Sequence, residues 1–273
     1  MAQIIDGKRL AEKIRAEVKQ RIESTQTRPG LAVLLVGSDP ASHTYVGIKE
    51  KACAEVGINS EKYLYFASEP EEKLIAKIEE LNARADIHGI LVQLPLPEQD
   101  EDKIIAAIDP AKDVDGFHPK NIMRLDDGNP LRVSPVALGI MKMIESTGRP
   151  IAGLKAVVVA SELFAHPIVK LLQDQDVETE VVRPADPELA EKTKTADILV
   201  TAVGKPGLIT GEMIREGAIV IDIGTTKVEG KIKGDVDFES ASEVAGWISP
   251  VPGGVGPMTV AYLLVNVLKS ATH

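Results

Sequence analysis

The sequence predicts an α/β fold with two domains, in which strands buried on both faces alternate with helices as in a doubly wound parallel sheet. Short, continuous apolar runs such as residues 31–37 (LAVLLVG) and 218–224 (AIVIDIG) are typical of strands covered on both sides. Stretches with apolar residues at helical spacing separate these runs. A chain of 273 residues favours two domains over one.

The first half of the chain predicts helices and strands in regular alternation. Leu10, Ile14, Val18 and Ile22 recur at helical intervals, so we expect a helix before the strand at 31–37. The elements expected after that strand are a helix over 42–56, a strand over 62–66, a helix over 71–84 and a strand over 89–94.

The second half repeats the alternation after a connecting helix. Ser134 and Pro135 resemble an N-cap followed by a first-turn proline, which opens a helix to about Glu145. The elements expected beyond it are strands over 155–160, 177–182, 196–203 and 218–224, helices from Pro167 and over 187–193, and a last helix from Pro257 to about Lys269. We assign residues 1–135 with the last helix, 257–273, to a first domain and residues 136–256 to a second.

Composition excludes several classes of partner. The formal net charge is −10 and no segment gathers lysine and arginine, so we expect no nucleic-acid partner. A single cysteine, Cys53, excludes an internal disulfide and a thiolate zinc site, and fits a reducing compartment. The start of the chain lacks the apolar core of a secretion signal, and no apolar stretch reaches spanning length. We therefore expect a cytoplasmic protein without a membrane partner.

Tyr45 and Lys49 are the first candidates for chemistry. They lie four residues apart on the helix that follows the first apolar strand, so their side chains share a face at the end of the sheet where ligands bind. A lysine partly desolvated beneath a flat ligand has a lowered pKa and can transfer protons near neutral pH. The structural alternative is an aromatic residue at the edge of the core and a solvated charge.

Gln93 and Asp115 are the next candidates. Gln93 ends an apolar strand before two prolines, and its amide offers both a donor and an acceptor; the alternative is a turn that only terminates the strand. Asp115 lies in an acidic loop, KDVDGFHP, that lacks the ligand series of an EF-hand. We therefore expect no metal there.

Six segments in order give a more specific indication. They are TYVGIKEKAC, GILVQLPLP, KDVDGFHP, AVGKPG, EGAIVIDIG and SPVPGGVGPMTV, and they extend over almost the whole chain. The series resembles the FolD family of methylenetetrahydrofolate dehydrogenase/cyclohydrolases. The resemblance implies an N-terminal catalytic domain that binds folate, a C-terminal Rossmann-like domain that binds NADP or NAD, a last helix that returns to the first domain, and a homodimer.

The resemblance also implies roles for single residues. Tyr45 would stack on the aminobenzoate ring, and Lys49 would be the essential group of the cyclohydrolase step. Gln93 would hold and tune Lys49, while Asp115 would accept hydrogen bonds from the pterin. The substrate-binding residues implied are Tyr45, Lys49, Val92, Gln93, Leu94, Asp115, Pro252, Gly253, Gly254, Pro257 and Thr259.

The cofactor loop departs from the family pattern, which has glycines at both ends of a loop with basic residues. Here the segment reads VASELFAHP, with Val159 and Ala165 where glycines are expected. A valine would add a branched side chain where glycine lets the backbone approach a diphosphate. The cofactor-binding residues implied are Val159, Ala160, Ser161, His166, Arg183, Gly204 and Thr225.

The expected activity is folate one-carbon interconversion. We expect hydrolysis of 5,10-methenyltetrahydrofolate to 10-formyltetrahydrofolate, together with NADP- or NAD-dependent oxidation of 5,10-methylenetetrahydrofolate. The altered loop leaves one alternative, a cyclohydrolase that has lost dinucleotide binding. A second alternative is a non-catalytic folate-binding or assembly protein that has kept the fold of an ancestral enzyme.

Overall fold

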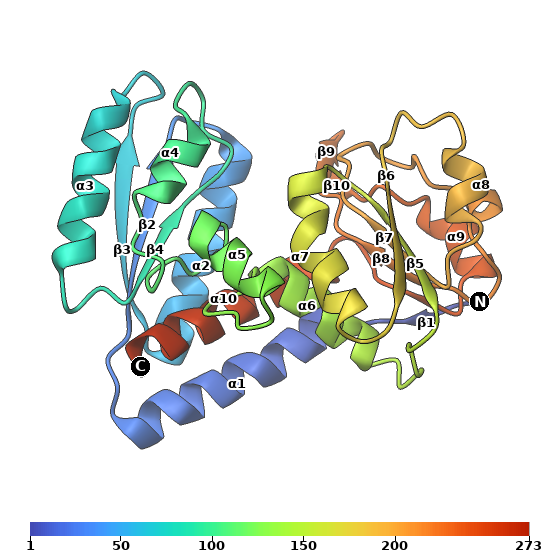
Figure 1. Cartoon of the computed structure of the whole chain (residues 1–273), viewed down its shortest axis with the longest axis horizontal. Helices are drawn as coiled ribbons and strands as arrows, with labels where there is room; N and C mark the ends of the chain where they lie inside the picture. The colour runs from blue at the N-terminus through green and yellow to red at the C-terminus, as the bar shows by residue number, and fades with distance from the viewer. Residues whose placement is uncertain (273) are drawn as a thin grey trace. The chain divides into compact units, whose positions relative to one another are not determined.

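The chain forms two compact units in the computed structural model, which describes residues 1–272 (Figure 1). The first unit comprises Glu12–Pro135 and the residues from Val260 onward. The second unit comprises Met1–Ala11 and Val136–Thr259. Among residues 1–272, no helix combines the length and the apolarity needed to cross a lipid bilayer.

A three-stranded parallel sheet in the order β3-β2-β4 is the centre of the first unit. Its strands are β2 (Gly30–Val36), β3 (Asn59–Tyr65) and β4 (Gly89–Val92). The helices begun in this half of the chain are α1 (Gly7–Thr25), α2 (Pro40–Val56), α3 (Glu71–Ala83), α4 (Glu101–Ala106) and α5 (Pro119–Asp126).

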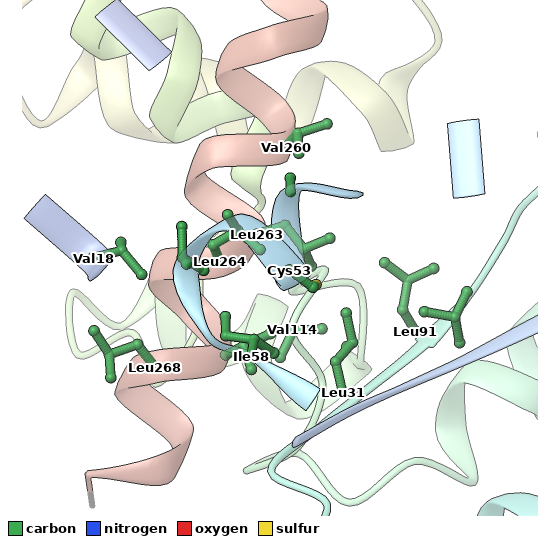
Figure 2. Close-up of a cluster of buried hydrophobic side chains, with 14 of the residues drawn as sticks. Val18, Leu31, Cys53, Ile58, Leu91, Val114, Val260, Leu263, Leu264 and Leu268 are labelled. Atoms are coloured by element: carbon green, nitrogen blue, oxygen red, sulfur yellow. The ribbon is translucent and has the colours of Figure 1, made fainter. Parts of the chain in front are cut away.

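Alternation along β2 produces two apolar layers, one on each face of this sheet. Leu31, Val33 and Leu35 share a cluster with residues of α2 and of the last helix, α10 (Val255–Ala271). Figure 2 shows this cluster, to which Val260, Leu263, Leu264 and Leu268 of α10 contribute along the length of the helix. The other face of β2 packs against α3 and α4.

The second unit contains a parallel sheet of six strands, in the order β1-β11-β8-β7-β5-β6. Its strands are β1 (Gln3–Ile4), β5 (Lys155–Val159), β6 (Glu178–Val182), β7 (Ile198–Thr201), β8 (Ile219–Asp222) and β11 (Trp247–Ile248). The other elements are α6 (Pro135–Glu145), α7 (Glu162–Gln173), α8 (Leu189–Thr193), α9 (Phe238–Val244), a 3-10 turn (Gly211–Met213) and the hairpin of β9 (Thr226–Val228) and β10 (Lys231–Lys233).

The order of this sheet reverses at β5. The chain runs from β5 outward to β6 and then returns to the opposite side of β5 to form β7 and β8. A crevice opens at such a reversal, because the connections on the two sides leave the strands in opposite directions. The carboxyl ends of β5 and β7 are therefore the expected place for a ligand.

Two elements differ from the sequence-based expectation. Helix α7 begins at Glu162 rather than at Pro167, because the Ser161 side chain caps it by accepting a hydrogen bond from the Phe164 N–H at 3.4 Å. The short strand β1 pairs with β11, which groups Met1–Ala11 with the second unit, although we assigned residues 1–135 to one domain. The pairing of β1 with β11, which is distant in the sequence, determines the unit to which the first residues belong, and no local sequence pattern predicts such a pairing.

Candidate active site

The location of Lys49 follows from the start of α2. The helix begins at the carboxyl end of β2, where the Asp39 side chain caps it by accepting a hydrogen bond from the Ser42 N–H at 2.7 Å. Lys49 lies more than two turns further on and is only 7 % exposed. It shares the buried side of α2 with Val46 and Cys53. The lysine is therefore part of the buried side of the helix and not of its solvated face.

Gln93 is the direct partner of this lysine. The Lys49 Nζ donates a hydrogen bond to the Gln93 Oε1 at 3.0 Å. Gln93 follows β4, where its backbone N–H donates to the Leu34 carbonyl at 2.9 Å and its side-chain amide donates to the Leu94 carbonyl at 2.8 Å. These bonds fix the amide, so its oxygen faces the amine.

Asp115 provides the opposite charge. Burial lowers the pKa of Lys49, and the Asp115 carboxylate opposes that effect. Burial likewise raises the pKa of Asp115 to about 6, against the attraction of the Lys49 ammonium. An amine whose pKa is lowered by burial reaches its neutral, proton-accepting form closer to neutral pH. The pair therefore has the electrostatics of a proton-transfer site.

The neighbouring Asp113 was not identified from the sequence, and it holds the loop that carries Asp115. Its buried carboxylate accepts hydrogen bonds from the backbone N–H groups of Gly116 at 3.0 Å and His118 at 2.8 Å, and from the Asn121 side chain at 2.8 Å. Gly116 has a φ of +73°, which favours glycine. The aspartate followed by a glycine three residues later is the only local signal of this turn.

The remaining folate residues fall into two groups. Tyr45 is half-buried one turn before Lys49, and Val92, Leu94 and Asp115 line a small hollow at the end of β4. The other group belongs to the second unit, and its members are Pro252, Gly253, Gly254, Pro257 and Thr259. Their role in substrate binding stays a prediction.

The glycine loop of the second unit packs tightly against the start of α1. The Gly253 carbonyl accepts a hydrogen bond from the Lys8 N–H at 2.9 Å. A Cβ atom added to Gly7 would lie 2.0 Å from the Gly254 carbonyl oxygen. The close approach requires glycine at position 7, so the beginning of the chain and this loop constrain each other.

A hollow of about 260 Å³ lies at the reversal of the second sheet. It is lined by residues that follow β5, β7 and β8, namely Ser161, Phe164, Ala202, Val203, Gly204, Ile223, Gly224, Thr225 and Thr226. Ser161, Gly204 and Thr225 were predicted to bind the cofactor. Gly224 was not, although it ends the apolar run that predicts β8.

Val159 does not occupy this hollow. It is the last residue of β5, and its side chain belongs to an apolar cluster with Leu199 and Val220. Ala165 is fully buried within α7. The expected obstruction by Val159 is therefore absent, because strand alternation places the valine on the same side as Val157.

Three other predicted positions do not line the hollow. Ala160, between β5 and Ser161, is buried, and His166 lies within α7. Arg183 directly follows β6, and its guanidinium forms an exposed ion pair with Glu162 at 2.8 Å. An arginine after the second strand of such a sheet is where a ribose 2′-phosphate is recognised.

The position of the hollow suits the diphosphate of a dinucleotide. It lies at the reversal of the strand order, beside the N-terminus of α7, whose backbone N–H groups suit an anion. Gly204 and Gly224 contribute backbone without side chains to its wall. A diphosphate could approach the main chain closely at both glycines.

These features define a two-domain α/β enzyme that uses a nicotinamide dinucleotide. Two family profiles match the chain: the catalytic domain of tetrahydrofolate dehydrogenase/cyclohydrolase over residues 5–115, and the NAD(P)-binding domain of the same enzymes over residues 134–273. The chain belongs to the tetrahydrofolate dehydrogenase/cyclohydrolase family. The resemblance to FolD and the predicted α/β fold class are confirmed.

Relatives match over the full length. The bifunctional protein FolD of Polynucleobacter asymbioticus is 48 % identical, with 99 % of this chain and 97 % of the relative covered. The solved structure of FolD from Campylobacter jejuni has a TM-score of 0.95 at 40 % identity, covering 100 % of this chain and 99 % of that one. FolD of Trypanosoma brucei, complexed with NADP and an inhibitor, also has a TM-score of 0.95, at 37 % identity and 99 % and 97 % coverage.

Proposed function

We propose that Lys49 transfers the proton in the hydrolysis of 5,10-methenyltetrahydrofolate to 10-formyltetrahydrofolate, and that the same chain oxidises 5,10-methylenetetrahydrofolate with NADP or NAD. The observation that supports this role is the hydrogen bond from the buried Lys49 Nζ to the Gln93 Oε1 at 3.0 Å. A buried amine held by a fixed amide is costly for stability and useful for proton transfer.

The hydrolytic step needs a group that first accepts a proton and then returns it. Water attacks the methenyl carbon, and the neutral amine of Lys49 accepts the proton that the water loses. The resulting ammonium donates that proton to the ring nitrogen as the bond between this nitrogen and the carbon breaks. The hydroxyl on the carbon loses its remaining proton to the amine, which releases it to water, and the formyl group is left on the other nitrogen. Gln93 orients the amine throughout, because its oxygen occupies one N–H of Lys49.

The dehydrogenase step uses the hollow of the second unit. A nicotinamide cofactor bound there supplies the acceptor for the hydride. Ser161 and the N-terminus of α7 would hold the diphosphate, and Arg183 would meet the adenosine ribose. The ion pair of Arg183 with Glu162 bears on cofactor choice, because a 2′-phosphate would compete with the Glu162 carboxylate for the guanidinium.

Two measurements on the purified full-length chain test this function. We expect the absorbance of methenyltetrahydrofolate to decay faster with protein than in buffer alone, and equilibrium titration to detect binding of NADP or NAD. Hydrolysis without dinucleotide binding at millimolar concentration would leave a cyclohydrolase only. Folate binding without hydrolysis would favour the non-catalytic alternative.

Folate binding is expected to weaken below pH 6 because of Asp115. Burial raises the pKa of this carboxyl from 3.8 to about 6, so it is ionised above that pH and protonated as the pH falls through it. A protonated carboxyl cannot accept the same hydrogen bonds from a pterin. KM should rise about tenfold for each pH unit below the pKa. The Asp115→Asn variant should lack this break in its KM profile, and an unchanged break there would exclude Asp115 as its source.

We infer a homodimer that forms through β3. This strand is at the edge of its sheet, and its outer edge has no strand partner within residues 1–272. Leu64 is 60 % exposed and the adjacent Phe66 is 81 % exposed. A second copy of the same strand is a suitable partner, because two identical edges can pair about a two-fold axis.

Substitution of Phe66 tests the dimer. Sedimentation equilibrium should give a dimer for the wild type and a monomer for Phe66→Glu, since the charge would be buried on association. Phe238→Glu, at a partly exposed phenylalanine of the second unit, is the matched control and should stay dimeric. A monomeric wild type at micromolar concentration would contradict the inference.

The cytoplasm is our proposed location for this enzyme. Cys53 is buried as a free thiol, and burial raises its pKa to about 12. A chain with a single, unpaired cysteine suits a reducing compartment. Fractionation of cells that express the chain would test this.

A further inference from the structure

Two buried aspartates lie behind the dinucleotide hollow without lining it. Asp222 is the last residue of β8 and is 3 % exposed, and Asp235 follows β10 and is fully buried. The catalytic scheme above uses neither of them. Burying a carboxylate is costly unless donors satisfy it, so each needs a physical explanation.

Asp235 holds the loop that follows β7. Its Oδ2 accepts the N–H of Val203 at 2.6 Å, and its Oδ1 accepts the N–H of Lys205 at 2.8 Å. These two residues flank Gly204, which lines the hollow and has a φ of +72°. One carboxylate therefore fixes the backbone on both sides of the glycine.

Asp222 extends the same arrangement to the loop that follows β8. Its Oδ1 accepts the N–H groups of Gly224 at 2.9 Å and Asp235 at 3.0 Å, and its Oδ2 accepts the N–H of Val236 at 2.9 Å. Gly224 lines the hollow, and Asp235 is the residue that holds Gly204. The two carboxylates thus connect two walls of the hollow through backbone N–H groups.

Glycine makes this close approach possible. A Cβ atom on Gly224 would lie 2.5 Å from the Asp235 carboxyl carbon, and one on Gly234 would lie 1.9 Å from the Asp222 Oδ2. Neither distance is tolerated by real side chains. Glycine is therefore required at positions 224 and 234 for the two carboxylates to lie this close to the backbone.

We propose that Asp235, supported by Asp222, is a positioning residue for dinucleotide binding. It keeps residues 203–205 in the conformation that shapes the hollow, so that little ordering is left to occur on binding. This inference rests on the proposed dehydrogenase function. It explains why buried carboxylates occur where a less costly residue would serve stability alone.

Equilibrium titration of full-length Asp235→Asn with NADP and NAD tests the proposal. An asparagine offers one acceptor oxygen to two N–H donors, so one donor is left unpaired and the loop loosens. We expect the dissociation constant to rise about tenfold or more. Hydrolysis of methenyltetrahydrofolate measured without dinucleotide should stay at the wild-type rate.

Asp197→Asn is the matched control. Asp197 is also buried, but it precedes β7 at the opposite end of the strand, where it accepts the N–H of Lys155 at 3.1 Å and forms ion pairs with Arg149 and Arg215. We expect this variant to lose thermal stability and to bind dinucleotide like the wild type. An equal loss of binding in both variants would overturn the proposal.

Amide hydrogen exchange of the wild type tests whether Asp235 holds the loop, even if Asp235→Asn does not fold. The N–H groups of Val203 and Lys205 should exchange on the order of tenfold more slowly than those of Glu229 and Gly230 in the hairpin turn. Equal exchange would overturn the proposal, as would unchanged dinucleotide binding by Asp235→Asn. A wild type that binds no dinucleotide would instead overturn the dehydrogenase function itself, and this inference with it.

Discussion

Lys49→Met is expected to lower the rate of methenyltetrahydrofolate hydrolysis by about 10²- to 10⁴-fold, the usual effect of removing a general acid–base group. Methionine has a similar length and no charge, so it suits the buried side of α2. Removal of Lys49 ends the cost of burying its ammonium but leaves the buried Asp115 carboxyl without its opposite charge, so we also expect some loss of stability. Initial rates followed by absorbance, together with thermal unfolding, measure both effects.

Lys103→Met is the control for this substitution. Lys103 lies in α4 of the same unit, and its side chain is 65 % exposed in an ion pair with Glu71. An exposed pair of this kind contributes little to stability, so we expect wild-type rates and stability. A Lys49→Met variant that hydrolyses as fast as Lys103→Met would exclude Lys49 from proton transfer.

Gly204→Val should weaken dinucleotide binding strongly and leave hydrolysis intact. Gly204 lines the hollow, so a valine side chain would reduce its volume. Its φ of +72° also strains a branched residue by about 1–2 kcal/mol. We expect the dissociation constant for NADP or NAD to rise by about 10²-fold, which corresponds to nearly 3 kcal/mol. Titration and the hydrolysis assay on the same sample separate the two activities.

Gly207→Val controls for strain alone. Gly207 lies on the same loop with a φ of +67°, and a Cβ atom there would meet nothing within 4 Å. It does not line the hollow. Its valine variant should lose similar stability and retain dinucleotide affinity. Equal affinities for the two valine variants would show that the hollow is not the binding site.

The sequence predicts the long helices and the apolar strands of the fold and omits several short elements. β2, β5, β7 and β8 are recognisable because strands covered on both faces are continuous apolar runs. The elements that were not predicted are α4, α5, α9, β1, β11, the 3-10 turn and the β9–β10 hairpin. Most of them are too short for a regular apolar period to be recognised, and β1 is a strand only because β11 lies beside it.

The candidate site follows the same rule. Lys49, Gln93 and Asp115 could be predicted because each occupies a recognisable place near a strand end or in the loop beyond one. Asp222 and Asp235 could not. Asp235 accepts a hydrogen bond from the backbone N–H of Val203, 32 residues earlier. Every residue except proline has such a donor, so the sequence does not indicate which one an aspartate will contact. The side-chain direction of Val159 was missed because an aligned residue indicates position along a strand and not the face it occupies.

Each unit is built from two separate segments of the chain, so the enzyme cannot be divided into its units by a single cut. The polypeptide passes from one unit to the other after Ala11, Pro135 and Thr259. Cleavage after Pro135 would deprive the leading fragment of Leu263 and Leu264, which complete its apolar layer, and the trailing fragment of β1. We therefore expect neither fragment to fold stably alone. Exchange of cofactor preference between relatives therefore requires grafting of loops, since a contiguous gene segment carries neither unit whole.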